Sequence, residues 1–193
     1  MKKTLEKFVL FLHKKYGITP DILTYIRIFS APWLALFISK ILIHKSITLT
    51  IIILLFYFLI ISTDFLDGIL ARAIPENKHH DHSYGGMLDR LADKILIIFI
   101  LIPFGFNLFT FLLILAESIL AFQALFSPND KKQALKAGKI KMILQTFLLP
   151  ILILQAVTNF PDMVAYLYII LTIIATYVSV YSHYSHLFYF KND

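Results

Sequence analysis

The sequence contains no cysteine, and only 16% of its residues are charged. The lack of cysteine excludes disulfide bonds and any metal site built on thiolates. The few charged residues lie mostly in short segments between long apolar runs. The net charge of +6 therefore fits a surface that faces anionic lipid better than one that binds nucleic acid. Since neither an internal repeat nor a separate polar region is evident, we expect one domain over residues 1–193.

Apolar residues, in contrast, are abundant and make up 59% of the sequence, whereas soluble domains contain about 45–50%. A membrane-spanning helix needs about 20 mostly apolar residues. The composition and the apolar runs together predict an all-α integral membrane protein with six transmembrane helices. The predicted spans cover residues 22–43, 47–72, 85–106, 108–127, 140–158 and 163–188. The segment PFGFN at Pro103–Asn107 separates the third span from the fourth.

Residues 1–20 precede the first span and carry a different pattern. Lysines alternate there with apolar residues at helical spacing, namely Leu5, Phe8, Val9, Leu12 and Tyr16. This pattern predicts an amphipathic helix that lies on an anionic lipid surface. An ordinary exposed helix is the alternative.

The distribution of lysine predicts the orientation in the membrane, because cytoplasmic loops carry an excess of Lys and Arg. Lysines gather before the first span and after the fourth, at Lys2, Lys3, Lys7, Lys14, Lys15, Lys131, Lys132, Lys136, Lys139 and Lys141. With six spans, both termini are then cytoplasmic. The end of the second span and the start of the third lie on that side too.

Two aspartates and an arginine follow the second apolar run, in STDFLDGILARAI at Ser62–Ile74. A carboxylate at the centre of a bilayer costs roughly 2.5–3.5 kcal/mol, so we expect these residues at the cytoplasmic edge. Helical spacing places two sets of residues on two stripes. One set is Asp64, Asp67, Gly68, Ala71 and Arg72, and the other is Gly85, Asp89 and Asp93. A short loop joins the helices, so the stripes can face each other and gather four carboxylates.

Four neighbouring carboxylates repel one another, and divalent cations would remove that repulsion. Oxygen ligands select Mg²⁺, Mn²⁺ or Ca²⁺, and a pair of such ions can clamp a pyrophosphate. The small residues beside the carboxylates would let a ligand approach the helix backbones, and Arg72 would pair with a phosphate. The alternative is that the aspartates are ordinary charges at the ends of two membrane helices.

The pattern D-x-x-D-G-x-x-A-R, a spacer and G-x-x-x-D-x-x-x-D resembles the signature of the CDP-alcohol phosphotransferases. The resemblance implies transfer of a phosphoalcohol from a CDP-linked donor to a hydroxyl group, with release of CMP, in a homodimer. It further implies that two cations, Mg²⁺ or Mn²⁺, bind Asp64, Asp67, Asp89 and Asp93, and that Asp93 is the catalytic base. The residues implied to contact the cytidine diphosphate are Asp67, Gly68, Ala71, Arg72 and Gly85.

The spacer of this chain, residues 73–84, is longer than is usual in the family. Its sequence AIPENKHHDHSY most simply enlarges a solvated loop. Its group His79, His80, Asp81 and His82 offers an alternative, because imidazole ligands suit Zn²⁺ or Ni²⁺.

Three further segments resemble the phosphatidylglycerophosphate synthase and cardiolipin synthase branch of the family. They are LDRLADK, KAGKIKMILQ and TPDILTYIR. This resemblance implies CDP-diacylglycerol as donor and glycerol 3-phosphate as the first acceptor. An inositol phosphate, serine and phosphatidylglycerol are the alternatives.

The fourth span departs from that branch, which has arginines beside and beyond the position of Glu117. This chain has Ala116 there, followed by Gln123 and Ala124, and the missing arginines weaken the case for glycerol 3-phosphate as acceptor. Candidates to bind the acceptor instead are Arg27, Arg90, Lys139 and Lys141. A divalent-cation transporter is the rival from another functional class, although it would place acidic residues near mid-membrane on several helices.

Overall fold

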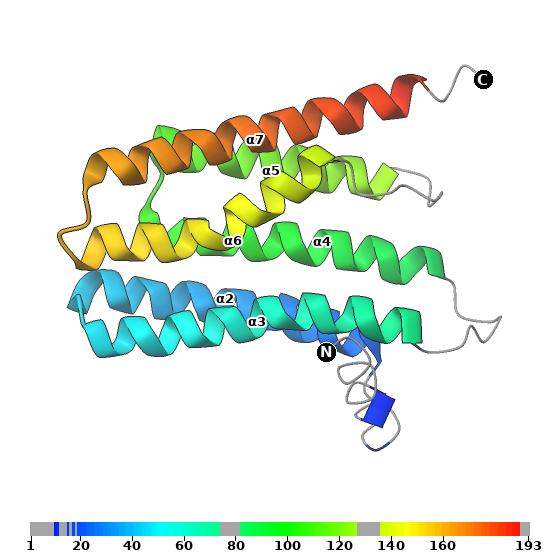
Figure 1. The fold of residues 1–193 in the computed structure, drawn as a ribbon, viewed down its shortest axis with the longest axis horizontal. Helices are drawn as coiled ribbons and strands as arrows, with labels where there is room; N and C mark the ends of the chain where they lie inside the picture. The colour runs from blue at the N-terminus through cyan, green and yellow to red at the C-terminus, as the bar shows by residue number, and fades with distance from the viewer. Residues whose placement is uncertain are drawn as a thin grey trace.

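The computed structural model describes residues 10, 11, 15, 17, 19–73, 82–126 and 136–189. Six long helices lie side by side in this part of the chain (Figure 1). They are α2 (Pro20–His44), α3 (Ile47–Ala73), α4 (His82–Leu101), α5 (Leu108–Phe126), α6 (Lys136–Val157) and α7 (Asp162–Tyr189). The all-helical architecture predicted from the sequence is thus confirmed for the described residues. The predicted N-terminal amphipathic helix falls almost wholly outside them.

Local sequence signals set the ends of the helices. Thr19 caps α2 by accepting a hydrogen bond from the backbone N–H of Ile22, and Pro20 takes the first helical position, where no backbone donor is needed. Between α4 and α5, Pro103 lies in a short 3₁₀ helix, Ile102–Phe104, and Gly105 follows with φ +80°. The predicted break at PFGFN is therefore confirmed, because proline and a left-handed glycine together stop an α-helix.

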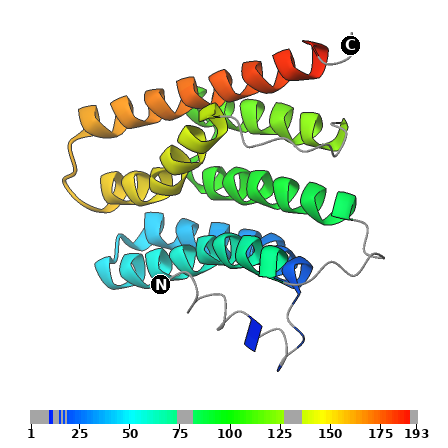
Figure 2. The ribbon, with the colours of Figure 1, turned by 45° about the vertical axis from the view of Figure 1, so that its right-hand side comes forward.

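The order of the helices places α2 and α3 on one side of the bundle and α5 and α7 on the other, with α4 and α6 between them (Figures 1 and 2). α2 packs along both α3 and α4, and α7 packs along α5 and α6. The shared core includes Leu34 and Ile38 of α2 and Leu149 and Ile153 of α6, all fully buried. Consecutive helices run in opposite directions, so the end of α3 and the starts of α2 and α4 meet at one end of the bundle.

The outer surface of the bundle is rich in large apolar side chains. Phe29 is 70% exposed, Trp33 61%, Leu55 61% and Leu171 55%. Such a surface is suited to lipid contact rather than to water. Five of the described helices, α2, α3, α5, α6 and α7, are long and apolar enough to cross a membrane. The protein is therefore an integral membrane protein.

Helix α4 does not meet the same criterion, although it lies within the bundle and packs against α2 and α5. The reason is its composition, because four charged residues, Asp89, Arg90, Asp93 and Lys94, lie in its middle. Only its last seven residues, 95–101, are continuously apolar. The third predicted span, residues 85–106, therefore remains a prediction, and two of these charged residues, Asp89 and Asp93, belong to the candidate site.

The orientation of the bundle can be tested with single cysteines, since the chain has none of its own. Ser46 lies in the turn between α2 and α3, and the exposed Lys139 lies near the start of α6. We expect Ser46→Cys and Lys139→Cys to react with an impermeant maleimide from opposite sides of sealed vesicles, with position 139 on the cytoplasmic side. Labelling of both positions from the same side would contradict the topology.

Candidate active site

Four aspartates from two helices converge on one arginine from a third. The Nη1 atom of Arg27, on α2, lies 3.1 Å from Asp64 Oδ1 of α3, and 3.0 Å and 2.7 Å from the Oδ1 atoms of Asp89 and Asp93 on α4. Its Nη2 atom lies 2.5 Å from Asp67 Oδ2 of α3. The structure thus brings together all four predicted metal-binding carboxylates.

Helix packing explains this convergence. The spacing of Asp64 and Asp67, and that of Asp89 and Asp93, puts each pair on one helical face. Both α3 and α4 pack against α2, and Arg27 lies about two turns from the start of α2. The stripes predicted from the sequence therefore converge on Arg27 of an intervening helix. Sequence reasoning placed Arg27 only among the candidates to bind the acceptor.

The charges of this cluster do not balance. Four carboxylates, if ionised, carry four negative charges, and the guanidinium of Arg27 supplies one positive charge. Arg27 is 1% exposed, and its Nε atom is buried without a hydrogen-bond partner among the described residues. Asp67 is buried, whereas the side chains of Asp64, Asp89 and Asp93 are 30–38% exposed. Neighbouring carboxylates repel one another when several of them are ionised. The cluster is therefore suited to binding further positive charge.

The donor atoms fit a divalent cation. Asp64, Asp89 and Asp93 each offer a carboxylate oxygen, and these oxygens all lie within 4.8 Å of one another. Carboxylate oxygens are the preferred ligands of Mg²⁺, Mn²⁺ and Ca²⁺. The same three aspartates contact Nη1 of Arg27, so this position already holds a cationic group.

The small residues of the two stripes lie on α3 and α4, the helices that carry the four aspartates. Gly68 and Ala71 lie on α3 with Arg72, and Gly85 lies on α4. The side chains of Ala71 and Arg72 fall outside what the structure describes. The same holds for residues 74–81, which include His79, His80 and Asp81. Predictions about those side chains and about the long spacer remain predictions.

A second buried polar cluster joins α5, α6 and α7. Glu117 of α5 is fully buried and lies 2.8 Å from Nζ of Lys141 on α6. The side-chain amide of Gln145, one turn further along α6, donates to Glu117 Oε1 (2.6 Å), the oxygen that also lies 2.8 Å from Lys141 Nζ. The same amide contacts Thr176 of α7. Lys94 of α4 follows Asp93 in sequence, and its charge interacts with both Glu117 and Asp93.

Three of the four candidates for acceptor binding have partners within the protein. Arg27 is held by aspartates and Lys141 by Glu117, whereas Lys139 is exposed on α6. The Nε atom of Arg90 donates to the carbonyl of Gly86 in its own helix.

Lys94 is a further cation near the site that the sequence analysis did not identify. Its position directly after Asp93 was the available signal.

Breaking the buried ion pair gives a prediction about stability. Lys141→Met leaves the carboxylate of Glu117 buried without its cation, which typically costs about 3–5 kcal/mol. We expect this loss in the free energy of unfolding of the detergent-purified protein, measured by denaturant titration. The exposed Lys139→Met is the matched control and should change stability by no more than about 0.5 kcal/mol. Adding Glu117→Gln to Lys141→Met should restore part of the loss. Equal effects of the two lysine substitutions would contradict the prediction.

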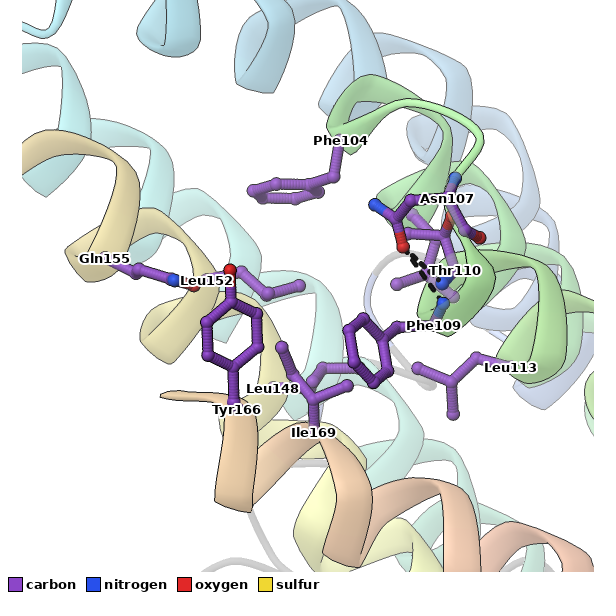
Figure 3. Close-up of a pocket in the computed structure, with 11 residues that line it drawn as sticks. Phe104, Asn107, Phe109, Thr110, Leu113, Leu148, Leu152, Gln155, Tyr166 and Ile169 are labelled. Carbon is purple, nitrogen blue, oxygen red and sulfur yellow. Dashed lines mark hydrogen bonds between the residues drawn. The ribbon is translucent and has the colours of Figure 1, made fainter. Parts of the chain in front are cut away.

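A cavity of about 200 Å³ lies at the opposite end of the bundle (Figure 3). It is lined by the end of α4 and its 3₁₀ extension, the starts of α5 and α7 and the end of α6, including Phe104, Asn107, Gln155 and Tyr166. Figure 3 shows Asn107 accepting hydrogen bonds at the start of α5. Because none of the four aspartates lines it, this cavity is not part of the candidate site.

Comparison with known protein families gives a match over the part of the chain that contains the candidate site. The profile of the CDP-alcohol phosphatidyltransferase family matches residues 17–181, which include all four aspartates, Arg27 and Glu117. No curated protein and no solved structure matches the chain.

Proposed function

Because the chain belongs to the CDP-alcohol phosphatidyltransferase family, we propose that it transfers a phosphatidyl group from CDP-diacylglycerol to glycerol 3-phosphate and releases CMP. Family membership makes the chain a phosphotransferase enzyme of phospholipid biosynthesis, with a CDP-alcohol as donor and an alcohol as acceptor. The diacylglycerol donor and the glycerol 3-phosphate acceptor are the finer part of the proposal. The observation that carries the proposed transfer reaction is the convergence of four aspartates at one end of a membrane bundle.

In the proposed reaction, the acceptor hydroxyl oxygen attacks the phosphorus that bears the diacylglycerol. A new P–O bond forms, the anhydride bond to CMP breaks, and CMP leaves with that bond's electrons. Asp93 takes the proton of the attacking hydroxyl. Arg72 and the backbone near Gly68, Ala71 and Gly85 hold the cytidine diphosphate.

The aspartates Asp64, Asp67, Asp89 and Asp93 would hold two divalent cations, Mg²⁺ or Mn²⁺. When bound, such ions neutralise the diphosphate and stabilise the charge of the leaving CMP. The convergence of the carboxylate oxygens of Asp64, Asp89 and Asp93 supports this assignment. Family membership also favours a transferase over the rival cation transporter.

Lysines near the aspartates support an anionic acceptor. The charge of Lys94 interacts with Asp93 and with the Glu117–Lys141 pair, and Lys139 precedes Lys141 on the same helix. Glu117 neutralises Lys141, so among the described side chains Lys94, Lys139 and Arg90 are our candidates to bind an acceptor phosphate. An inositol phosphate, serine and phosphatidylglycerol remain the alternative acceptors.

We further propose that the site faces the cytoplasm and that the protein is a homodimer with one catalytic domain per chain. The lysine distribution supports the orientation, because Lys139, Lys141 and the aspartates lie toward the same end of the bundle. The homodimer rests on the family resemblance.

An acceptor panel tests the proposal. Purified protein would be supplied with CDP-diacylglycerol, Mn²⁺ and one acceptor at a time, and the lipid product would be identified by mass spectrometry. We expect phosphatidylglycerophosphate from glycerol 3-phosphate. A product formed only from serine, an inositol phosphate or phosphatidylglycerol would show that glycerol 3-phosphate is not the acceptor. The assignment as a transferase would stand.

A further inference from the structure

Arg27 contacts the same oxygens that a divalent cation would need. Its Nη1 atom lies between 2.7 and 3.1 Å from one carboxylate oxygen each of Asp64, Asp89 and Asp93. These three aspartates are also the group whose oxygens lie close enough together to bind one metal ion. The buried guanidinium therefore contacts the very oxygens that would form the coordination site.

A guanidinium and a metal ion would compete for these oxygens. Arginine has only N–H donors and stays charged at all relevant pH values, so it can neither ligate a cation nor give up its charge. Oxygen ligands hold Mg²⁺ at about 2.0–2.1 Å. An ion bound to the same oxygens would thus lie at most about 5 Å from Nη1, and the two like charges would repel strongly.

We propose that Arg27 is a resident cation of the aspartate cluster, and that a divalent metal ion must displace its Nη1 from Asp64, Asp89 and Asp93 in order to bind. The inference rests on the proposed function, which makes these aspartates metal ligands. In the metal-free protein, Arg27 offsets the repulsion among the carboxylates and so holds α2, α3 and α4 together. Metal binding then has to overcome these ion pairs.

The displaced guanidinium needs another anionic partner, because Arg27 is 1% exposed. The diphosphate of a CDP-linked donor has the required chemistry, since guanidinium groups bind phosphate oxygens in a forked geometry. The Nε–H of Arg27 is buried and has no acceptor within the described residues, so it is available to a phosphate oxygen. Arg27 would therefore exchange its carboxylate partners for phosphate oxygens as the metal and the donor bind. Binding of the metal would then strengthen binding of the donor, and the reverse.

Metal binding to the purified full-length protein tests the inference. Mn²⁺ alone would be titrated into wild type and Arg27→Gln, with calorimetry to measure affinity and a thermal scan to measure stability. Because Arg27→Gln removes the competing guanidinium, the variant should bind Mn²⁺ roughly 5- to 150-fold more tightly than wild type, the usual range of coupling between linked binding events. The variant should be less stable than wild type without metal, and Mn²⁺ should raise its melting temperature more than that of wild type.

Lys40→Gln is the matched control. It removes one positive charge from the same helix, at an exposed position about 20 Å further along the axis, and should leave Mn²⁺ affinity unchanged. Arg27→Lys keeps the charge but cannot bridge three carboxylates in the same way, so its affinity should lie between those of wild type and Arg27→Gln. If Arg27→Gln does not fold without metal, Arg27→Lys decides the question.

The outcomes separate the inference from the proposed function. Tighter Mn²⁺ binding in the Arg27 variants, but not in the control, supports the inference. Equal or weaker binding in these variants, with clear binding to wild type, overturns it and leaves the metal site intact. If neither wild type nor any variant binds Mn²⁺, the inference and the metal site of the proposed function both fail.

Discussion

Asp64→Ala is expected to abolish the binding of both metal and CDP. Asp64 lies first on the α3 stripe, and one of its oxygens belongs to the group that can hold a metal ion. By family resemblance it contacts both cations. Since the cations would bridge the pyrophosphate to the protein, loss of the metal also removes the main attachment of the nucleotide. Calorimetric titration of CDP in the presence of Mn²⁺ should therefore show binding to wild type and no measurable heat with the variant.

Asp162→Ala serves as the control for that experiment. Asp162 lies at the start of α7, is exposed and accepts a hydrogen bond from Gln155. Its removal changes the net charge by the same amount, far from the aspartate cluster, and should leave CDP binding unchanged. Retention of normal CDP binding by Asp64→Ala would contradict the assignment of Asp64 as a metal ligand.

Asp93→Asn is expected to separate catalysis from binding. The asparagine keeps the shape of the side chain and one oxygen, so CDP should still bind with Mn²⁺ present. It cannot accept the proton of the acceptor hydroxyl. Transfer should then fall by about 10²–10⁴-fold, the usual contribution of a positioned general base. Product lipid formed per minute by the detergent-purified variant measures this loss.

Two results would revise the role of Asp93. If Asp93→Asn loses CDP binding as completely as Asp64→Ala, Asp93 acts mainly as a metal ligand and another group must be the base. If the variant transfers at the wild-type rate, the assignment of Asp93 as base is wrong. Asp89→Asn is the matched comparison, because Asp89 lies one turn earlier on the same face of α4 and also contacts Arg27. We expect it to affect metal affinity more than proton transfer.

The helices could be predicted from the sequence because apolar runs of membrane length are local signals. The structure places α2 at Pro20–His44 where the apolar pattern predicts residues 22–43, and α5 at Leu108–Phe126 where it predicts 108–127. The break at Pro103 and Gly105 was also local. For α4, hydropathy is less informative, since the four charged residues in the middle of the helix interrupt its apolar sequence.

The centre of the site could not be predicted in the same way. Helical spacing groups Asp64 with Asp67 and Asp89 with Asp93, but it does not say which helix lies between the two pairs. That depends on the packing of α2 against α3 and α4, which brings Arg27 to residues 40 and 66 positions away in sequence. The ion pair of Glu117 and Lys141 is likewise a long-range contact, between helices on which either residue could have faced lipid.

The release of CMP by the purified wild-type protein tests the central claim most directly. The protein would be incubated with CDP-diacylglycerol and glycerol 3-phosphate, with Mn²⁺ or with a chelator, and CMP would be measured by chromatography. The account predicts that CMP is released only when both the divalent cation and an acceptor are present, and that the chelator stops the reaction. No CMP release from the folded protein with Mn²⁺ or Mg²⁺ and any acceptor of the panel would contradict it.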